Sequence, residues 1–386
     1  MNRISYFPPP WGWSDYACLW RLAAPGAFSS PAWFTDEIAN IDDGRQTASF
    51  NSGKSAIRAV LQAWGIGSGD EVIVPAFLCA SAVQPIISLG ARPVAVDVDP
   101  EDLNISVESI QRHLTERTRA ILVAHIYGNA ALIQPIERLA AERGVKVLDD
   151  AAQSYGASLD GKPLGFWGDA GIIAFGPGKS TVSARGGIVI HRGLPLPEPE
   201  PESSGTVFAA YAKFILRRCL RRWTQPIIEG LGRSKGLSTE SARAACESSF
   251  VFGSMAAVDA AVGKNQTARL RTGLIDRRKM NFDILEETLR TLRSARVIKP
   301  QRGQSSWVKF PLVLESPKKD IFLSLRGKGI EVYPSYVPLS FYKPDQAERY
   351  FADTLSERVL ELPLTLTREQ TQWMASIVRT TLEEAA

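Results

Sequence analysis

Two glycine–lysine–serine tripeptides are the first residues in this sequence whose types could do chemistry: Gly53-Lys54-Ser55 and Gly178-Lys179-Ser180. A nucleotide-hydrolysing P-loop needs another glycine five residues before the glycine of such a tripeptide. Ala48 and Ile173 occupy those positions. Neither tripeptide therefore completes the glycine loop that wraps a triphosphate, and we exclude an NTPase.

Three features spaced along the chain could instead hold a smaller cofactor. Gly53-Lys54-Ser55 opens a predicted helix, whose free N–H groups and dipole favour a phosphate. Asp149-Asp150 ends a predicted strand, at the edge where open α/β sheets bind ligands. Lys179 lies beyond the next strand, in the turn Gly176-Pro177-Gly178, where little side-chain bulk surrounds its amine. Each feature is common by itself.

An anion cradle, a carboxylate and a lysine at one sheet edge are the parts that a pyridoxal phosphate (PLP) site needs. The lysine would form a Schiff base with the cofactor and later shuttle protons. The carboxylate would keep the pyridine nitrogen protonated, so that the ring can act as an electron sink. The combination indicates PLP.

The elements that would position these residues alternate between short apolar runs and amphipathic stretches. The pattern predicts strands over 71–75, 93–98, 120–125, 145–149, 171–175 and 187–190, and helices over 55–64, 81–89, 107–114 and 133–143. Such alternation implies helical crossovers and a largely parallel sheet that is covered on both faces. We therefore predict an α/β large domain.

The composition changes after the last of these strands. Residues 194–202 alternate proline with leucine or glutamate, which predicts an extended, solvated linker. Residues 207–223 form a basic amphipathic stretch, with Lys213, Arg217 and Arg221 at every fourth position. This stretch is either a helix packed on the protein or on a partner, or a helix on an anionic membrane surface. We favour the packed helix, because amphipathicity is what any surface helix shows.

The C-terminal third predicts one long helix followed by a small domain. The helix should run over 255–292, and strands are expected over 308–314 and 330–333. The chain would then divide into three parts. Residues 1–45 form an N-terminal arm, and residues 46–250 form a large PLP-binding domain with an insertion at 194–245. Residues 251–386 form a linking helix and a C-terminal small domain.

Aromatic residues are concentrated at the N-terminus, in Trp11, Trp13, Trp20 and Trp33. An exposed tail would not normally hold so much aromatic surface. We expect this arm to pack on the body, on a partner subunit or over the active-site mouth.

Composition excludes several classes of protein. Of the 386 residues, 45% are apolar and 22% charged, which is the globular mixture, and a net charge of +4 does not suggest a nucleic-acid binder. The four cysteines are far apart and the three histidines complete no zinc spacing, so we expect no metal. The N-terminus lacks a signal-peptide core, and Pro75 and Pro85 interrupt the apolar run 72–91. We expect a cytoplasmic protein with free thiols.

Four stretches also occur in a recognisable order: VKVLDDAAQ at 145–153, GFWGDA at 165–170, FGPGK at 175–179 and GGIV at 186–189. With further matching elements from about residue 45 to the C-terminus, they resemble the DegT/DnrJ/EryC1/StrS aminotransferase family. The resemblance implies a PLP enzyme of the aspartate-aminotransferase fold (PLP fold type I), with a mixed, mostly parallel sheet and a smaller C-terminal α+β domain.

The resemblance also assigns roles to single residues. Lys179 falls on the Schiff-base lysine and Asp150 on the partner of the pyridine nitrogen. Gln153 falls on the residue beside the cofactor ring and its hydroxyl. Gly53-Lys54-Ser55 falls on the phosphate-binding turn, where Lys54 replaces a frequent threonine and could pair with the phosphate.

Several positions depart from the family pattern. Cys79 lies where an aromatic residue usually stacks on the ring, so Phe77 or an N-terminal tryptophan would stack instead. Ala174 stands where the family commonly has a phosphate-binding serine, and Ser340 replaces a frequent histidine. The usual asparagine and arginine are missing from residues 252–254.

The resemblance implies transfer of an amino group from an amino acid, with glutamate expected, to a nucleotide-linked keto sugar in surface polysaccharide or secondary-metabolite biosynthesis. Lys179 argues against the sugar 3-dehydratases of the family, which carry histidine there. Two alternatives remain: amination of a non-sugar ketone, such as a cyclitol or an antibiotic precursor, and a paralogue that binds PLP or a partner without turnover. Because the family works as homodimers with each site at the subunit boundary, we expect a homodimer.

Overall fold

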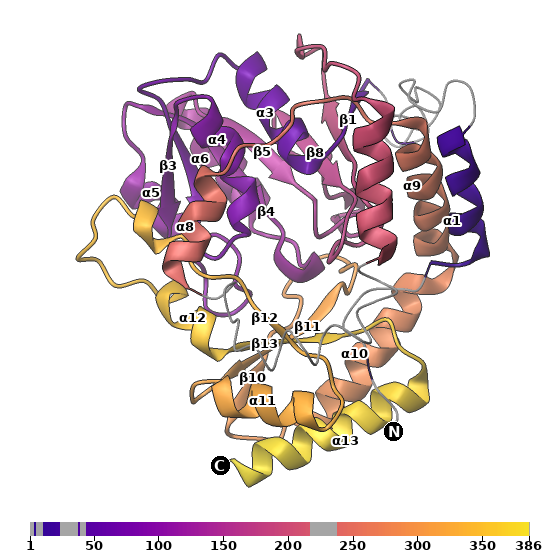
Figure 1. Cartoon of the computed structure of the whole chain (residues 1–386). Coiled ribbons are helices and arrows are strands. Elements are labelled where there is room, and N and C mark those ends of the chain that lie inside the picture. The colour runs from indigo at the N-terminus through magenta and orange to yellow at the C-terminus, as the bar shows by residue number, and fades with distance from the viewer. Residues whose placement is uncertain (1–3, 5–10, 24–37, 39–43, 217–237, 386) are drawn as a thin grey trace.

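The computed structural model describes residue 4, residues 11–23, residue 38, and residues 44–216 and 238–385. A large sheet is covered by helices, and a smaller sheet with its own helices lies at one end of this assembly (Figure 1).

Seven strands make the large sheet, in the order β1-β9-β8-β5-β4-β2-β3. Their bounds are β1 Gln46–Phe50, β2 Glu71–Pro75, β3 Arg92–Val96, β4 Thr118–Ala124, β5 Lys146–Asp150, β8 Ala170–Ala174 and β9 Gly187–His191. The strands from β3 to β8 pair in parallel, whereas β9 is antiparallel to both of its neighbours. The predicted mixed, mostly parallel sheet is confirmed. A separate two-stranded hairpin pairs β6 (Ser158–Leu159) with β7 (Lys162–Pro163).

Both faces of the large sheet are buried. Val72 and Val74 of β2 join one apolar cluster, and Ile73 between them joins another, as expected when successive side chains point to opposite faces. The helices between the strands are α3 Gly53–Ala63, α4 Gln84–Ser88, α5 Val107–His113 and α6 Ile133–Arg143. This is the arrangement that near-continuous apolar strands require.

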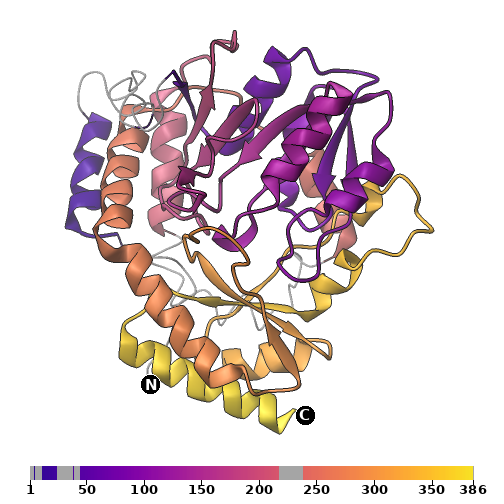
Figure 2. The same cartoon turned by 180° about the vertical axis from the view of Figure 1, so that it is seen from behind.

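The smaller sheet is antiparallel, in the order β10-β11-β13-β12. Its strands are β10 Ala295–Val297, β11 Lys309–Leu314, β12 Tyr333–Pro334 and β13 Val359–Pro363. Its helices are α11 Lys319–Gly327, α12 Ala352–Arg358 and α13 Arg368–Glu384. Phe310 and Leu362 lie in the core that this sheet shares with α10 (Ile275–Leu289) and α13. Figure 2 shows α10 and α13 along the outer side of this sheet.

Two expectations for the C-terminal third were wrong. The single helix predicted over 255–292 is interrupted between α9 (Ala257–Arg269) and α10, because Gly273 adopts a φ of 98° that glycine alone tolerates easily. The strand expected over 330–333 is reduced to Tyr333–Pro334, because the backbone on either side of Ile330 hydrogen-bonds Ile4 of the N-terminal arm instead.

The N-terminal arm contributes α1 (Trp13–Ala17) and η1 (Cys18–Ala23), which contact α9. The expectation that its tryptophans pack on the body holds for Trp11, which is 4% exposed. Trp13 and Trp20 do not pack on the body and are 91% and 64% exposed, so the expectation that they pack on a partner subunit or over the active-site mouth stays a prediction. Trp33 lies outside the described residues.

The insertion is less solvated than its composition suggested. Residues 194–203 have no regular structure, as predicted, but Leu194 and Leu196 pack against the core, and the Glu202 side chain is only 7% exposed. Residues 204–216 are helical and bury Val207 and Tyr211 against the body. The rest of the basic stretch, including Arg217 and Arg221, lies outside the described residues, as do the remainder of the arm and Cys219. Within the described part of the chain, none of the helices has both the length and the apolar character needed to cross a membrane.

Candidate active site

The C-terminal end of β5 carries two buried carboxylates with different tasks. Asp149 accepts hydrogen bonds from the backbone N–H groups of Gly165 and Trp167, at 2.7 and 2.9 Å. Its other oxygen lies 2.7 Å from His125 Nε2. Because His125 Nδ1 accepts the N–H of Ala131, the ring proton is on Nε2 and is donated to Asp149. Asp149 is therefore fully used in holding the local fold.

Asp150, the next residue, faces the candidate site. It is 5% exposed, and its Oδ1 accepts the backbone N–H of Ala152 at 2.9 Å. Burial raises the pKa of Asp150, and the charge of Lys179 is the largest influence in the opposite direction. The structure thus brings the predicted lysine and the predicted carboxylate within electrostatic reach of each other.

Lys179 lies in the loop between β8 and β9. Gly178 adopts a φ of 77°, and the Lys179 N–H donates to the carbonyl of Gly176 at 3.2 Å, which makes a tight turn. The side chain of Lys179 is half-buried. The next residue, Ser180, is buried and donates its hydroxyl to the Gln153 carbonyl at 3.1 Å.

Gln153 connects this loop to the small domain. Its Nε2 donates to the hydroxyl of Tyr336 at 2.7 Å, and among the described residues no group pairs with its buried Oε1. The Tyr336 ring lies 5.6 Å from that of Phe77, which is fully buried. Burial raises the pKa of Tyr336 well above its usual value, with a further contribution from Glu361, so its hydroxyl stays protonated.

The predicted phosphate-binding turn packs on the ends of β8 and β9. A Cβ on Gly53 would lie 2.7 Å from the Cβ of Ala174, and a Cβ on Gly187 would lie 2.4 Å from the Ser52 carbonyl oxygen. Only glycines permit this approach. The turn therefore sits beside the same strand ends as the loop of Lys179.

The three residues of the turn are placed differently. The Ser55 hydroxyl donates to Asn51 Oδ1 at 2.6 Å and is fully buried, and its N–H is capped by Ser52. This leaves the N–H groups of Gly53 and Lys54 as those that the cap does not use. The Ser55 hydroxyl is thus engaged within the protein, and the assignment of Ser55 to phosphate binding stays a prediction.

Lys54 and Cys79 lie on the same side of the site. Lys54 Nζ is 5.1 Å above the ring of Phe250, and burial lowers the pKa of Lys54 while Cys79 acts in the opposite direction. Cys79 Sγ lies 3.1 Å from Ser81 Oγ. Lys54 therefore carries a half-buried amine over the Phe250 ring, on the residue next to Gly53 of the turn.

Arg278 of α10 is a site neighbour that the sequence did not reveal. Its buried guanidinium donates to the carbonyls of Ser180 and Ser306, at 3.0 and 3.3 Å. Burial lowers the pKa of Arg278 to about 10, so it remains a cation at neutral pH. In the sequence, Arg277 and Arg278 look like two solvent-exposed arginines of a helix. No local sequence pattern indicates that Arg278 is the buried one.

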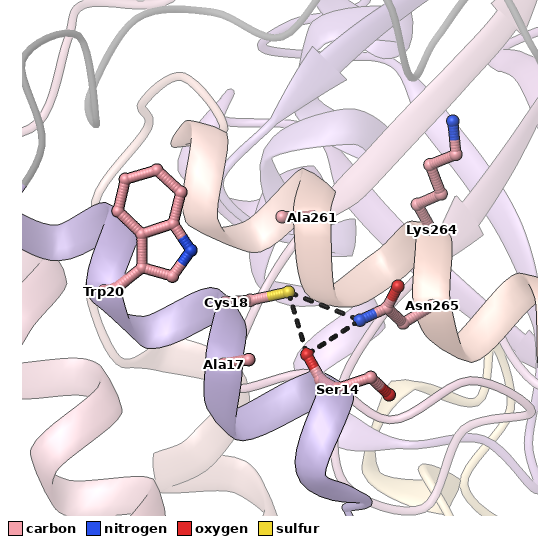
Figure 3. Close-up of a pocket in the computed structure, with 7 residues that line it drawn as sticks. All are labelled: Ser14, Ala17, Cys18, Trp20, Ala261, Lys264 and Asn265. Atoms are coloured by element: carbon pink, nitrogen blue, oxygen red, sulfur yellow. Dashed lines mark hydrogen bonds between the residues drawn. The ribbon is translucent and has the colours of Figure 1, made fainter.

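A cavity of about 480 Å³ lies elsewhere, between the N-terminal arm and α9 (Figure 3). Asn265 Nδ2 donates to the Ser14 carbonyl at 3.0 Å and lies 3.3 Å from Cys18 Sγ. The residues lining it are Ser14, Ala17, Cys18, Trp20, Ala261, Lys264 and Asn265. None of them is a predicted site residue, so this cavity is separate from the candidate active site.

Residues 31–196 and 231–379 match the model of the DegT/DnrJ/EryC1/StrS aminotransferase family. GDP-perosamine synthase of Vibrio cholerae is 30% identical over 197 residues, which cover 51% of this chain and 48% of that protein. L-glutamine:2-deoxy-scyllo-inosose aminotransferase of Streptomyces paromomycinus is 34% identical over 175 residues, or 45% of this chain and 41% of that protein. The chain thus spans less than half the length of these curated relatives.

Among solved structures, the aminotransferase TlmJ from Streptoalloteichus hindustanus is 23% identical, with a TM-score of 0.77 over the whole of both chains. At this identity the likeness establishes the fold, and the fold class predicted from the sequence is confirmed.

Proposed function

The chain belongs to the DegT/DnrJ/EryC1/StrS aminotransferase family, and on that basis we propose that it is a PLP-dependent aminotransferase. It moves an amino group from an amino acid, which we expect to be glutamate, to a keto sugar carried on a nucleotide. The name of the Vibrio cholerae relative, GDP-perosamine synthase, supports a nucleotide-linked sugar as the acceptor.

The residues of the site fit PLP. Gln153 Oε1 is buried without a partner among the described residues and would accept a hydrogen bond from the ring hydroxyl. Asp150 is a buried carboxylate that a cationic pyridine nitrogen would stabilise. The N–H groups of Gly53 and Lys54, with the Lys54 ammonium, would hold the phosphate.

PLP supplies an aldehyde that takes up the amino group and a protonated ring that draws electrons from the substrate carbon. Asp150 would hold the proton on the pyridine nitrogen, and the hydrogen-bonded Asp149–His125 pair fixes the strand end that carries Asp150. Lys179 would hold the cofactor through its Nζ and would carry a proton to and from the substrate carbon. Tyr336 orients the Gln153 amide.

One observation carries this proposal: Asp150 ends β5, which pairs in parallel with β8, and Lys179 in the loop after β8 is near enough for its charge to oppose the effect of burial on the pKa of Asp150. Open α/β sheets bind their ligands at the C-terminal edge of the parallel strands. A lysine and a carboxylate at that edge support amino transfer through PLP, whereas neither residue alone would.

The test is a half-reaction without acceptor. The PLP-loaded protein is mixed with L-glutamate, and we expect about one 2-oxoglutarate per site, because the amino group cannot be passed on. Adding keto-sugar nucleotides should then restart turnover. Lys179→Ala is the matched control and should give no 2-oxoglutarate. Failure of glutamate, glutamine, aspartate and alanine alike to yield a keto acid would contradict the proposal.

A second acceptor class is supported by a relative. The Streptomyces paromomycinus protein is named for an aminotransferase that acts on 2-deoxy-scyllo-inosose, a cyclitol ketone, and it is 34% identical over 175 residues. Replacing the keto-sugar nucleotides by this ketone in the same half-reaction distinguishes the two acceptors.

We also propose a homodimer, supported by family membership and by the exposed Trp13 and Trp20, of which Trp20 lines the cavity of Figure 3. A cytoplasmic location is supported by the free thiols of Cys79 and Cys246.

A further inference from the structure

The loop that follows Lys179 is held by segments far away in the chain. Trp11 of the N-terminal arm donates its indole Nε1–H to the carbonyl of Val182, at 3.1 Å. Both residues are buried. The indole proton has no other use at this site, so the contact fixes the backbone three residues beyond Lys179.

The insertion adds a second contact to the same loop. The hydroxyl of Tyr211 lies 3.2 Å from Ser183 Oγ and donates to Asp259 Oδ1 at 2.8 Å. All three side chains are buried, with Tyr211 only 1% exposed. The Tyr211 hydroxyl thus connects the loop, through Ser183, to the insertion and, through Asp259, to α9.

Glu202 supplies a third contact. It pairs with the guanidinium of Arg185, whose Nε also donates to Asp259 Oδ2 at 3.2 Å. Glu202 Oε1 accepts the Nδ2–H of Asn51 at 2.8 Å, and Asn51 in turn accepts the Ser55 hydroxyl. The proline-rich segment is therefore joined both to the end of the Lys179 loop and to the phosphate-binding turn.

The three contacts belong to one packed unit. The Trp11 ring lies 4.9 Å from Phe214 and 6.1 Å from Tyr211, and Val207 joins the same apolar cluster. Figures 1 and 2 show α1, α9 and the helix of residues 204–216 side by side. We call Trp11, Glu202 and Tyr211 the outer brace.

We propose that the outer brace positions Lys179, so that the N-terminal arm and the insertion serve catalysis through the loop of residues 179–186. This inference rests on the proposed function. The loop needs such support because Gly176 and Gly178 precede Lys179 and give the backbone freedom on that side. Arg278 holds the loop from the small-domain side, at Ser180, and the outer brace holds it from the other. Trp11, Glu202 and Tyr211 are positioning residues, since none of them touches the predicted cofactor residues.

The decisive variant is Tyr211→Phe, which removes one hydroxyl and keeps the ring packing. Tyr16→Phe is the matched control, because Tyr16 packs on the Trp11 ring at 5.5 Å in the same cluster. We expect amide hydrogen exchange in residues 179–186 of the cofactor-free protein to become about five- to ten-fold faster in Tyr211→Phe only. In the loaded enzyme kcat should fall by a similar factor while KM for the amino donor stays within about two-fold.

Trp11→Phe, with Trp13→Phe as its exposed counterpart in the same arm, provides a second test. It removes the indole donor to Val182 and should reproduce both effects. Unchanged exchange in 179–186 in both Tyr211→Phe and Trp11→Phe would overturn the brace. Faster exchange with an unchanged kcat would overturn its positioning role. If the variants show faster exchange but the wild-type protein yields no keto acid, the outer brace stands and the proposed function is refuted.

Discussion

At Asp259, burial and neighbouring charge act on the pKa in opposite directions. It is 1% exposed, and the groups that face it are Arg185, the Tyr211 hydroxyl and the Ala256 N–H. Burial raises the pKa of Asp259 from 3.8 to about 6, although Arg185 and the two hydrogen bonds act in the opposite direction. The Asp259 carboxylate is therefore protonated more readily in the folded protein than in the unfolded chain, although it has a cationic partner.

This shift fixes the sign of a pH dependence. Because the folded pKa of Asp259 is about 6 and the unfolded one 3.8, the folded state binds more protons between these values. The stability that Asp259 contributes is present below pH 3.8 and is lost as the pH rises through about 6. We expect the unfolding free energy of the wild type, minus that of Asp259→Asn, to increase by about 1 kcal/mol from pH 7 to pH 5.

Urea unfolding at both pH values measures this difference. Titrating groups that are not coupled to Asp259 are common to the two proteins and cancel. A difference that stays constant with pH would show that the pKa of Asp259 is not raised in the folded state.

At the scale of elements, the sequence predicted best where turns and apolar runs have sharp ends. β2 and α6 have the predicted bounds because a glycine-rich turn precedes β2 and Gly144, with a φ of 66°, closes α6. The break between α9 and α10 was missed, because the helical pattern continues through Gly273 and only the backbone shows its positive φ. β1 was missed because its five residues mix polar and apolar types without clear alternation.

The candidate site divides in the same way. The placement of Asp150 and Lys179 was predictable because Asp150 is the last residue of β5, Lys179 lies in the loop after β8, and parallel strands end at one edge. Tyr336, Arg278 and Trp11 were not, since their partners lie 183, 98 and 171 residues away. Contacts over such separations depend on how the two sheets and the arm pack, which periodicity does not encode.

At the scale of the whole molecule, we predict a dimer. Trp13 and Trp20 expose large aromatic surfaces on the arm, and such surfaces mark interfaces more often than solvent contacts. Sedimentation at micromolar concentration should give twice the chain mass of 42.3 kDa. A mass of one chain throughout the range used for activity assays would contradict this arrangement.

The most direct measurement of the central claim is the site of covalent cofactor attachment. Purified protein is incubated with PLP, reduced with borohydride to fix the carbon–nitrogen bond, digested and analysed by mass spectrometry. The account predicts the cofactor on Lys179 at about one per chain, and none on that peptide in Lys179→Ala. A protein that retains no PLP, or that carries it on Lys54 or other lysines while Lys179 stays unmodified, would contradict the account.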